Sequence, residues 1–129
     1  VSYSGTAYVD SLNIDGDLTL NENATANVTS VNLKSGTVKI SENGSVNIVG
    51  DVNLIGSGSI EGSANNVGII SLSGNSDQSI DVKIGSSTNA VKTVNVSNAE
   101  GNVTYLWLVE CNYINNNDFI TTYASLNKK

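Results

Sequence analysis

The chain has no histidine, proline, methionine or arginine, and it has a single cysteine. Without histidine there can be no Ser-His-Asp triad, no histidine-based acid–base pair and no imidazole ligand for a metal. Without arginine there is no bidentate clamp for an anion. We therefore predict no catalytic residue, no metal site and no cofactor, and we expect that the protein is not an enzyme.

The lone cysteine, Cys111, excludes a disulfide bond within the chain. It lies in the strongly apolar stretch LWLVECNYI. A cysteine in such a stretch is typical of a buried, unreactive thiol, and a reactive or intermolecular thiol is the alternative.

Charge is also scarce: 12 acidic residues and 6 lysines give a net charge of −6. The lysines are scattered and form no basic patch, so nucleic acid and anionic membranes are poor partners. No apolar run approaches the roughly 20 residues of a membrane-spanning helix, so we expect no membrane span in this segment. The 129 residues, of which 39% are hydrophobic, suffice for one domain with its own core.

What the chain does contain is a repeat. Residues 11–29, 30–50 and 51–71 open with SLNI, SVNL and DVNL. The first two copies each hold three apolar-x-apolar triplets separated by Gly, Asn, Asp and Ser. The six triplets are Leu12 with Ile14, Leu18 with Leu20, Ala26 with Val28, Val31 with Leu33, Val38 with Ile40, and Val46 with Ile48. The third copy is looser and keeps Val52, Leu54 and Ile60.

An alternating triplet predicts a short strand with one face inward, and a helical spacing of apolar residues is nowhere sustained. A sandwich or jelly roll could use such strands, but it would not require a fixed period. In a parallel β-solenoid each repeat is one turn, so stacked positions share an environment and select similar residues. We predict an all-β, right-handed parallel β-helix of about five to six turns of roughly 20 residues.

The repeat also predicts which residues stack. Leu12, Val31 and Val52 should form an inward row. The asparagines between inward residues should form outward rows, one of Asn13, Asn32 and Asn53 and another of Asn27 and Asn47. Amides stacked at about 4.8 Å can hydrogen-bond along such a row, although asparagine is also simply abundant in this chain.

Outside the clear repeats, residues 1–10 form an N-terminal edge and residues 72–102 form about two degenerate turns. Residues 103–129 differ, because both phases of NVTYLWLVECNYI are apolar. That pattern predicts a strand covered on both faces, with DFITTYASL as its cover. We expect the two to form a terminal cap that shields Trp107 and Cys111.

Three polar or aromatic features invite a functional reading. Asp15–Asp17 resembles part of a calcium loop but lacks the spacing of one, so a solvated turn is favoured. Glu22 and Glu42 occupy equivalent positions of the repeat and should share an exposed corner. The aromatic residues near the C-terminus would serve as a cap core or as a sugar platform; they are Tyr105, Trp107, Tyr113, Phe119 and Tyr123.

The phrases VNLKSGTVKISENGSVNI and QSIDVKIGSSTNAVKTVNVSNAEGNV resemble the passenger domains of bacterial autotransporters, most of all the rickettsial-type surface antigens. The resemblance covers about residues 11–104 and lies in style and repeat pattern. It implies a right-handed parallel β-helix, secretion to the bacterial outer membrane or beyond, and an adhesive or shielding role.

Together these observations predict a structural or adhesive segment of a secreted or cell-surface bacterial protein. Its partner would be a host protein or a glycan, and its open ends could associate end to end. The alternative is a module that binds or degrades polysaccharide, as tailspikes and lyases do. Clustered carboxylates and aromatic residues in a groove would favour that alternative.

Overall fold

The protein is described here from a computed structural model. It describes the backbone of residues 2–14, 16–33, 36–48, 52–54, 58–74, 77–97, 101–116 and 121–128. Within these ranges, the side chains of some strand residues are not described: 3, 9, 12, 14, 30, 32, 33, 48, 52–54, 116, 121, 122, 124, 125 and 128.

Every regular element in the described ranges is a β-strand. The strands are β1 (Ser2–Tyr3), β2 (Thr6–Ile14), β3 (Leu18–Leu20), β4 (Thr25–Leu33), β5 (Thr37–Ile40), β6 (Ser45–Ile48), β7 (Val52–Leu54), β8 (Ser59–Gly62), β9 (Ile69–Leu72), β10 (Gln78–Ile80), β11 (Lys83–Ile84), β12 (Val91–Val96), β13 (Val103–Asn116) and β14 (Thr121–Lys128).

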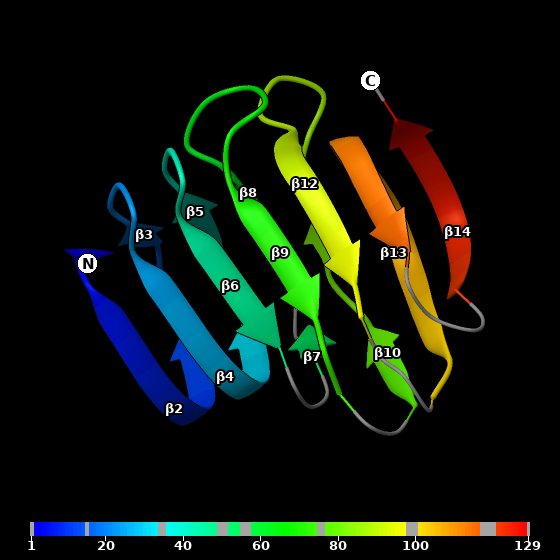
Figure 1. The fold of residues 1–129 in the computed structure, drawn as a ribbon, viewed down its shortest axis with the longest axis horizontal. Coiled ribbons are helices and arrows are strands. Elements are labelled where there is room, and N and C mark those ends of the chain that lie inside the picture. The colour runs from blue at the N-terminus through cyan, green and yellow to red at the C-terminus, as the bar shows by residue number, and fades with distance from the viewer. Residues whose placement is uncertain are drawn as a thin grey trace.

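The strands wind into a parallel coil with three faces. The ladder face, in front in Figure 1, consists of residues 6–9, 25–28, 45–48, 69–72, 93–96 and 113–116. The second face carries the later halves of β2 and β4, then β7, β10, the start of β13 and the start of β14. The third face carries β1, β3, β5, β8, β11, the middle of β13 and the end of β14. Because each strand pairs with its counterpart one turn away, the predicted parallel β-solenoid is confirmed.

The coil makes about four turns, slightly fewer than the five to six predicted. The repeat is longer in the middle of the chain than at Asn27–Asn47 or Asn95–Asn115, which is one reason for the difference. Asn27 and Asn47 lie 20 residues apart, whereas Ser71 and Asn95 lie 24 apart. The additional residues lie in the connections between strands rather than in the strands.

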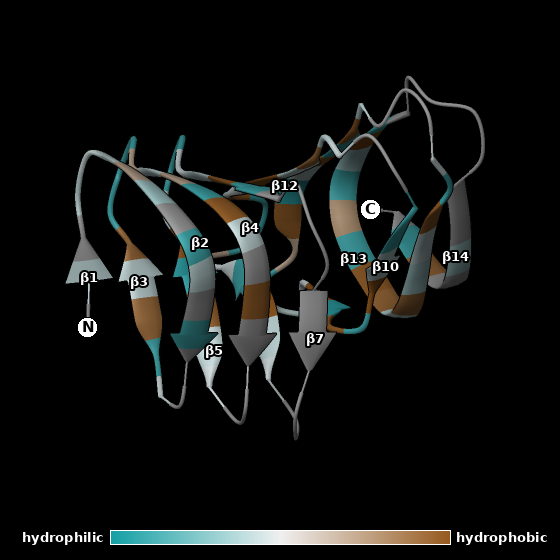
Figure 2. Cartoon of the chain, turned by 90° about the horizontal axis from the view of Figure 1, so that it is seen from below, coloured by the Kyte–Doolittle hydropathy of each residue, from teal (hydrophilic) through white to brown (hydrophobic). Residues whose placement is uncertain are grey.

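The core is a column of aliphatic side chains that fills the inside of the coil. On the third face Leu18, Val38, Ile60, Ile84 and Val109 follow one another in register, and all are buried. On the second face the backbone register aligns Leu12, Val31 and Val52 as predicted. Val31 is fully buried, while the side chains of the other two lie outside the described residues. In the first half of β4, residues 25–29, polar and hydrophobic residues alternate (Figure 2), as a strand with one buried face requires.

The corners between the third face and the ladder face stack as turns of the same shape. The N–H of Ala24 donates to the carbonyl of Asn21, and the N–H of Gly44 donates to the carbonyl of Ser41, at 3.0 and 2.9 Å. In both turns the third residue has a positive φ, 64° at Asn23 and 58° at Asn43. Asparagine tolerates this left-handed conformation better than most residues, which explains why both repeats place it there.

The two C-terminal segments pack together as predicted, but the prediction that one covers a face of the other is wrong. β14 does not fold back over β13; it stacks beside it as the next parallel strand. Cys111 is fully buried, as expected, but Trp107 is 41% exposed. The pairing register shifts between Tyr105 and Leu108, where the chain turns from the second face to the third. The apolar residues of both phases therefore mark a corner and not a strand covered on both sides.

Candidate functional site

The ladder face carries rows of outward side chains that bond along the coil. The Nδ2 atom of Asn47 donates to Oδ1 of Asn27 over 3.2 Å, and the Oγ of Ser45 bonds to the Oγ1 of Thr25 over 3.3 Å. The predicted Asn27–Asn47 row is thus confirmed and is hydrogen-bonded. Three residues of the same row were missed by sequence reasoning: Asn95 donates to Ser71 over 3.3 Å, and Asn115 donates to Asn95 over 2.9 Å.

A signal for part of the missed row is present in the sequence. The phrase VNV around Asn95 has the same aliphatic-Asn-aliphatic form as the VNI around Asn47. Ser71 replaces asparagine in the intervening turn, and Ser73 donates to Oδ1 of Asn47 over 2.9 Å. The changed repeat length and the Asn-to-Ser exchange hid the row from a search for one fixed phrase.

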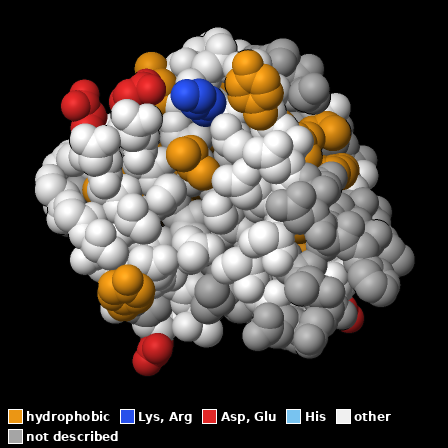
Figure 3. All heavy atoms as spheres, in the orientation of Figure 1, with side chains coloured by type: hydrophobic (Ala, Val, Ile, Leu, Met, Phe, Trp, Pro, Cys, Tyr) orange, Lys and Arg blue, Asp and Glu red, His pale blue; other side chains and the backbone are white. Residues whose placement is uncertain are grey.

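The outward residues of the ladder face have a common character, because none whose side chain is described is charged. They are Thr6, Tyr8, Thr25, Asn27, Ser45, Asn47, Ile69, Ser71, Thr93, Asn95, Tyr113 and Asn115. In the space-filling view this face is mostly uncharged, and the charged side chains lie toward its margins (Figure 3). The face is therefore a broad uncharged surface on which hydroxyl and amide groups predominate.

Breaking the ladder should cost stability. Asn47→Ala removes the donor to Asn27 and the acceptor for Ser73, so we expect the free energy of unfolding to fall by about 1 kcal/mol. Asn102→Ala is the matched control, because the side chain of Asn102 is exposed. Chemical denaturation of both variants measures the difference. Equal stability of the two variants would show that the ladder bonds contribute nothing beyond what water provides.

The other predicted asparagine row is aligned but is not shown to bond along the coil. The backbone register places Asn13, Asn32 and Asn53 opposite one another. The Nδ2 atom of Asn13 donates to Ser11 on its own strand over 3.2 Å. The side chains of Asn32 and Asn53 lie outside the described residues.

The described residues of the acidic corners show no ion-binding arrangement. Glu22 and Glu42 are both exposed, as expected of a solvated corner. In the Asp15–Asp17 turn, Oδ1 of Asp17 accepts the N–H of Thr37 from the next turn over 3.1 Å, and Asp15 lies outside the described residues. Within the described ranges no three Asp, Glu or Cys residues gather as metal ligands would.

The C-terminal aromatic residues that the structure describes do not form one cluster. Tyr105 and Tyr123 stack inside the coil with ring centroids 4.7 Å apart. Trp107 lies at the corner, Tyr113 projects from the ladder face with 55% exposure, and Phe119 is outside the described residues. The described aromatic residues therefore lie at different places on the coil. Both predicted roles, a cap core and a sugar platform, assumed that these residues form one group.

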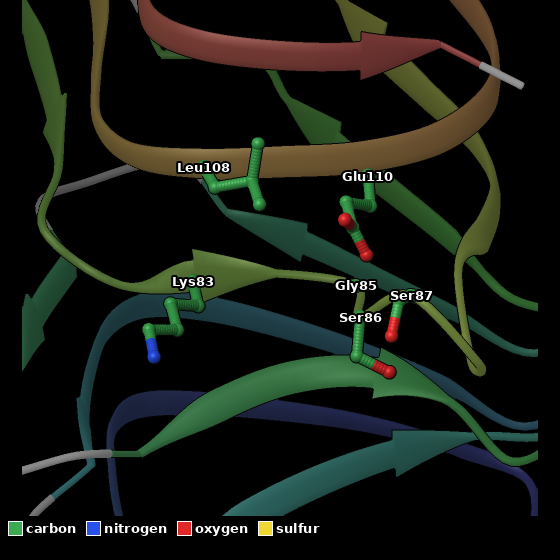
Figure 4. Close-up of a pocket in the computed structure, with 6 residues that line it drawn as sticks. All are labelled: Lys83, Gly85, Ser86, Ser87, Leu108 and Glu110. Carbon is green, nitrogen blue, oxygen red and sulfur yellow. The ribbon is translucent and has the colours of Figure 1, made fainter.

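A depression of about 270 Å³ lies on the third face beside the exposed corner. Its walls are β11, the loop that follows β11, and the middle of β13; the lining residues are Lys83, Gly85, Ser86, Ser87, Leu108 and Glu110. Glu110 extends from β13 toward the loop with the two serines, and Lys83 leaves β11 at the other end (Figure 4). Sequence reasoning missed this place, because Glu110 sits within an apolar run and its neighbours come from a different turn.

The Glu110 side chain is only 6% exposed, and its Oε2 atom is buried without a hydrogen-bond partner in the part of the chain that the structure describes. A buried carboxylate oxygen without a donor costs free energy. Replacement by an apolar side chain of similar size should therefore raise stability. We expect Glu110→Leu to raise the free energy of unfolding by about 1–3 kcal/mol.

Thermal unfolding of Glu110→Leu beside Glu42→Leu checks this expectation. Glu42 is exposed, so its replacement removes an acidic side chain without relieving a buried one. A melting temperature of Glu110→Leu at or below that of the control would mean that Glu110 stabilises the fold.

No family model matches the chain, and neither the curated proteins nor the solved structures that were compared with it contain a match. Among the described residues there is no helix long and apolar enough to cross a membrane. The geometry of the chain itself must therefore support any functional conclusion.

Proposed function

We propose that the chain is a structural and adhesive segment of a bacterial surface or secreted protein, and that the ladder face is its contact surface. The observation that carries this proposal is the uncharged ladder face, on which amide and hydroxyl groups are held in register by the coil. Side chains that are already ordered lose little conformational entropy when they bind a partner. A host protein or a glycan, both rich in hydrogen-bonding groups, would suit this surface.

The resemblance to autotransporter passengers supports the same proposal on separate grounds. It rests on the repeat style of residues 11–104 and adds the expectation of export to the bacterial outer membrane or beyond. A coil of this kind serves as a spacer as well as a surface, because each turn buries its core against its neighbours. In this proposal the segment binds or shields and catalyses no reaction.

Adhesion of coated beads tests the proposal. Beads carrying the purified chain should adhere to cultured host cells or to glycan-coated plates more than beads carrying albumin, and soluble chain should compete. The variant Asn47→Lys/Asn95→Lys places two charges on the ladder face and should reduce adhesion strongly. The matched control Thr19→Lys/Thr37→Lys changes outward positions of the third face, away from Lys83, and should leave adhesion unchanged.

Circular dichroism and thermal unfolding confirm that both double variants are folded. Adhesion no greater than that of albumin would contradict the adhesive role. Equal loss in the two variants would contradict the assignment to the ladder face. Labelling of intact bacteria with an antibody against the chain tests the proposed surface location separately.

The depression on the third face favours the polysaccharide-binding alternative to a limited extent. It brings a carboxylate, an ammonium group and two hydroxyls together beside an exposed tryptophan. No second carboxylate lines it, so the described residues offer no pair of acids for glycoside hydrolysis. Binding is therefore the only part of that alternative which the depression supports.

A further inference from the structure

We propose that the depression between β11 and β13 binds an uncharged hexose unit of a glycan, with Glu110 as the residue that accepts hydrogen bonds from its hydroxyls. The choice of a glycan rests on the proposed adhesive function, and the site is separate from the ladder face. The proposal stands on two independent observations, which are the depression itself and the buried carboxylate oxygen without a partner.

The first step is what Glu110 requires. A carboxylate only accepts hydrogen bonds, and the buried Oε2 atom has no donor among the described residues. A ligand that fills the depression can place a donor in good geometry against this oxygen, and a buried acceptor gains most from such a donor. Water alone competes poorly with such a ligand. A ligand that brings a hydroxyl or an N–H to this atom would therefore be held.

The second step is what the rest of the wall offers. Lys83 supplies only donors, and it lies at the end of the depression opposite Glu110. The Oγ of Ser86 accepts the N–H of Asn89 over 3.0 Å, which leaves its own proton to donate. A sugar hydroxyl both donates and accepts, so neighbouring hydroxyls of one ring can meet the carboxylate, the ammonium group and the serine together.

The third step concerns the apolar side. Leu108 lines the depression and is 37% exposed, and Trp107 beside it is 41% exposed. The Nζ atom of Lys83 lies 6.0 Å from the centre of the Trp107 ring, and the indole N–H donates to the carboxylate of Asp81. These contacts hold the indole near Lys83, and from there it and Leu108 would offer apolar surface to the C–H groups of a sugar ring.

Other ligands fit less well. A divalent cation would find one carboxylate, with the ammonium group of Lys83 on the same wall. A phosphate or a carboxylate would be drawn to Lys83 but would face the carboxylate of Glu110. An uncharged hexose avoids both repulsions, and this charge balance decides the ligand class.

Trp107 makes the test specific, because it is the only tryptophan of the chain. The probes are methyl glycosides of glucose, galactose and mannose, titrated into the intact chain while tryptophan fluorescence and backbone amide NMR shifts are recorded. At least one probe should change the fluorescence to saturation and shift the amides of residues 83–87 and 106–110. Calcium chloride and inorganic phosphate, titrated in the same way, should not.

Variants identify the residue. Glu110→Gln keeps the shape but replaces one carboxylate oxygen by an amide donor, and it should weaken binding about tenfold or more. Lys83→Ala should weaken binding to a smaller extent. Glu42→Gln is the matched control and should bind as the unchanged chain does. The amide spectrum of each variant shows whether it is folded, and if Glu110→Gln is not, Lys83→Ala and Ser86→Ala carry the test.

Two results would overturn the site: none of the three glycosides binds, or Glu110→Gln binds as well as the control. Saturable binding of calcium or phosphate at these residues would overturn the ligand class. The bead assay separates this inference from the proposed function. Adhesion that persists without any glycoside binding removes the hexose site alone, whereas loss of adhesion in every assay removes the adhesive role.

Discussion

Ile60→Asp is expected to destabilise the coil by about 4 kcal/mol or more, which is much of the total stability of a small domain. Ile60 is fully buried and stacks between Val38 of the preceding turn and Ile84 of the next. An aspartate there would place a carboxylate between two aliphatic side chains, neither of which can donate a hydrogen bond to it. Chemical denaturation, or failure to obtain folded protein, measures the effect.

The control for Ile60→Asp is Ser59→Asp, one position earlier on the same strand. Ser59 faces outward, opposite Lys83 of the next turn. Aspartate fits strands poorly, but it stays in water, so the expected loss is within about 1 kcal/mol. If the two variants lost equal stability, the assignment of inward and outward positions on β8 would be wrong.

Gly85→Ala is expected to lower the free energy of unfolding by about 3 kcal/mol. Gly85 has φ +76°, in the left-handed region that a side chain disfavours. A Cβ atom there would also overlap the carbonyl oxygen of Glu110 and approach the Glu110 Cβ at 3.2 Å. The overlapped atom belongs to the backbone of β13, which cannot move without disturbing the next turn.

Gly5→Ala separates the two causes. Gly5 has φ +85°, but a Cβ atom there would meet nothing within 4 Å. This variant should lose only the conformational part, about 1 kcal/mol. A loss at Gly85 no larger than the loss at Gly5 would mean that β11 and β13 lie farther apart than described.

The repeat made the fold predictable, because stacking forces equivalent residues into equivalent environments. The pairing of Asn27 with Asn47 and of Val38 with Ile60 follows directly from aligning the phrases. The turns at Asn23 and Asn43 follow in the same way, since both repeats place an asparagine where φ is positive. These features depend on the local sequence and on the period of the repeat, and the amino-acid sequence alone provides both.

The C-terminal segment, residues 103–129, was harder to predict, because its apolar pattern is compatible with two geometries. Alternating apolar residues from Val103 to Cys111 with further apolar residues between them describe a doubly covered strand. They describe equally well a strand that bends at an exposed corner. The bulge between Tyr105 and Leu108 decides between the two, and it follows from how β13 must pair with β10 and β11 at once. No local pattern encodes that constraint.

The two candidate sites also differ in how far the sequence predicted them. The ladder face was partly foreseen, because its residues recur with the repeat. The depression at Glu110 was not, because its walls come from residues 83–87 and 108–110, which only the coil brings together. The burial of a glutamate within an apolar run becomes evident in the folded chain and cannot be predicted from the sequence.

The coil itself is the central claim, and NMR contacts between strands test it most directly. A parallel solenoid predicts nuclear Overhauser contacts linking Asn27 to Asn47 and Ser71 to Asn95, 20 and 24 residues apart, at every described turn. It predicts no close Hα–Hα pairs between β5 and β6, which are consecutive in the chain but lie on different faces. Close Hα–Hα pairs between such consecutive strands are the mark of antiparallel hairpins. Finding them in place of the contacts one turn apart would contradict the solenoid.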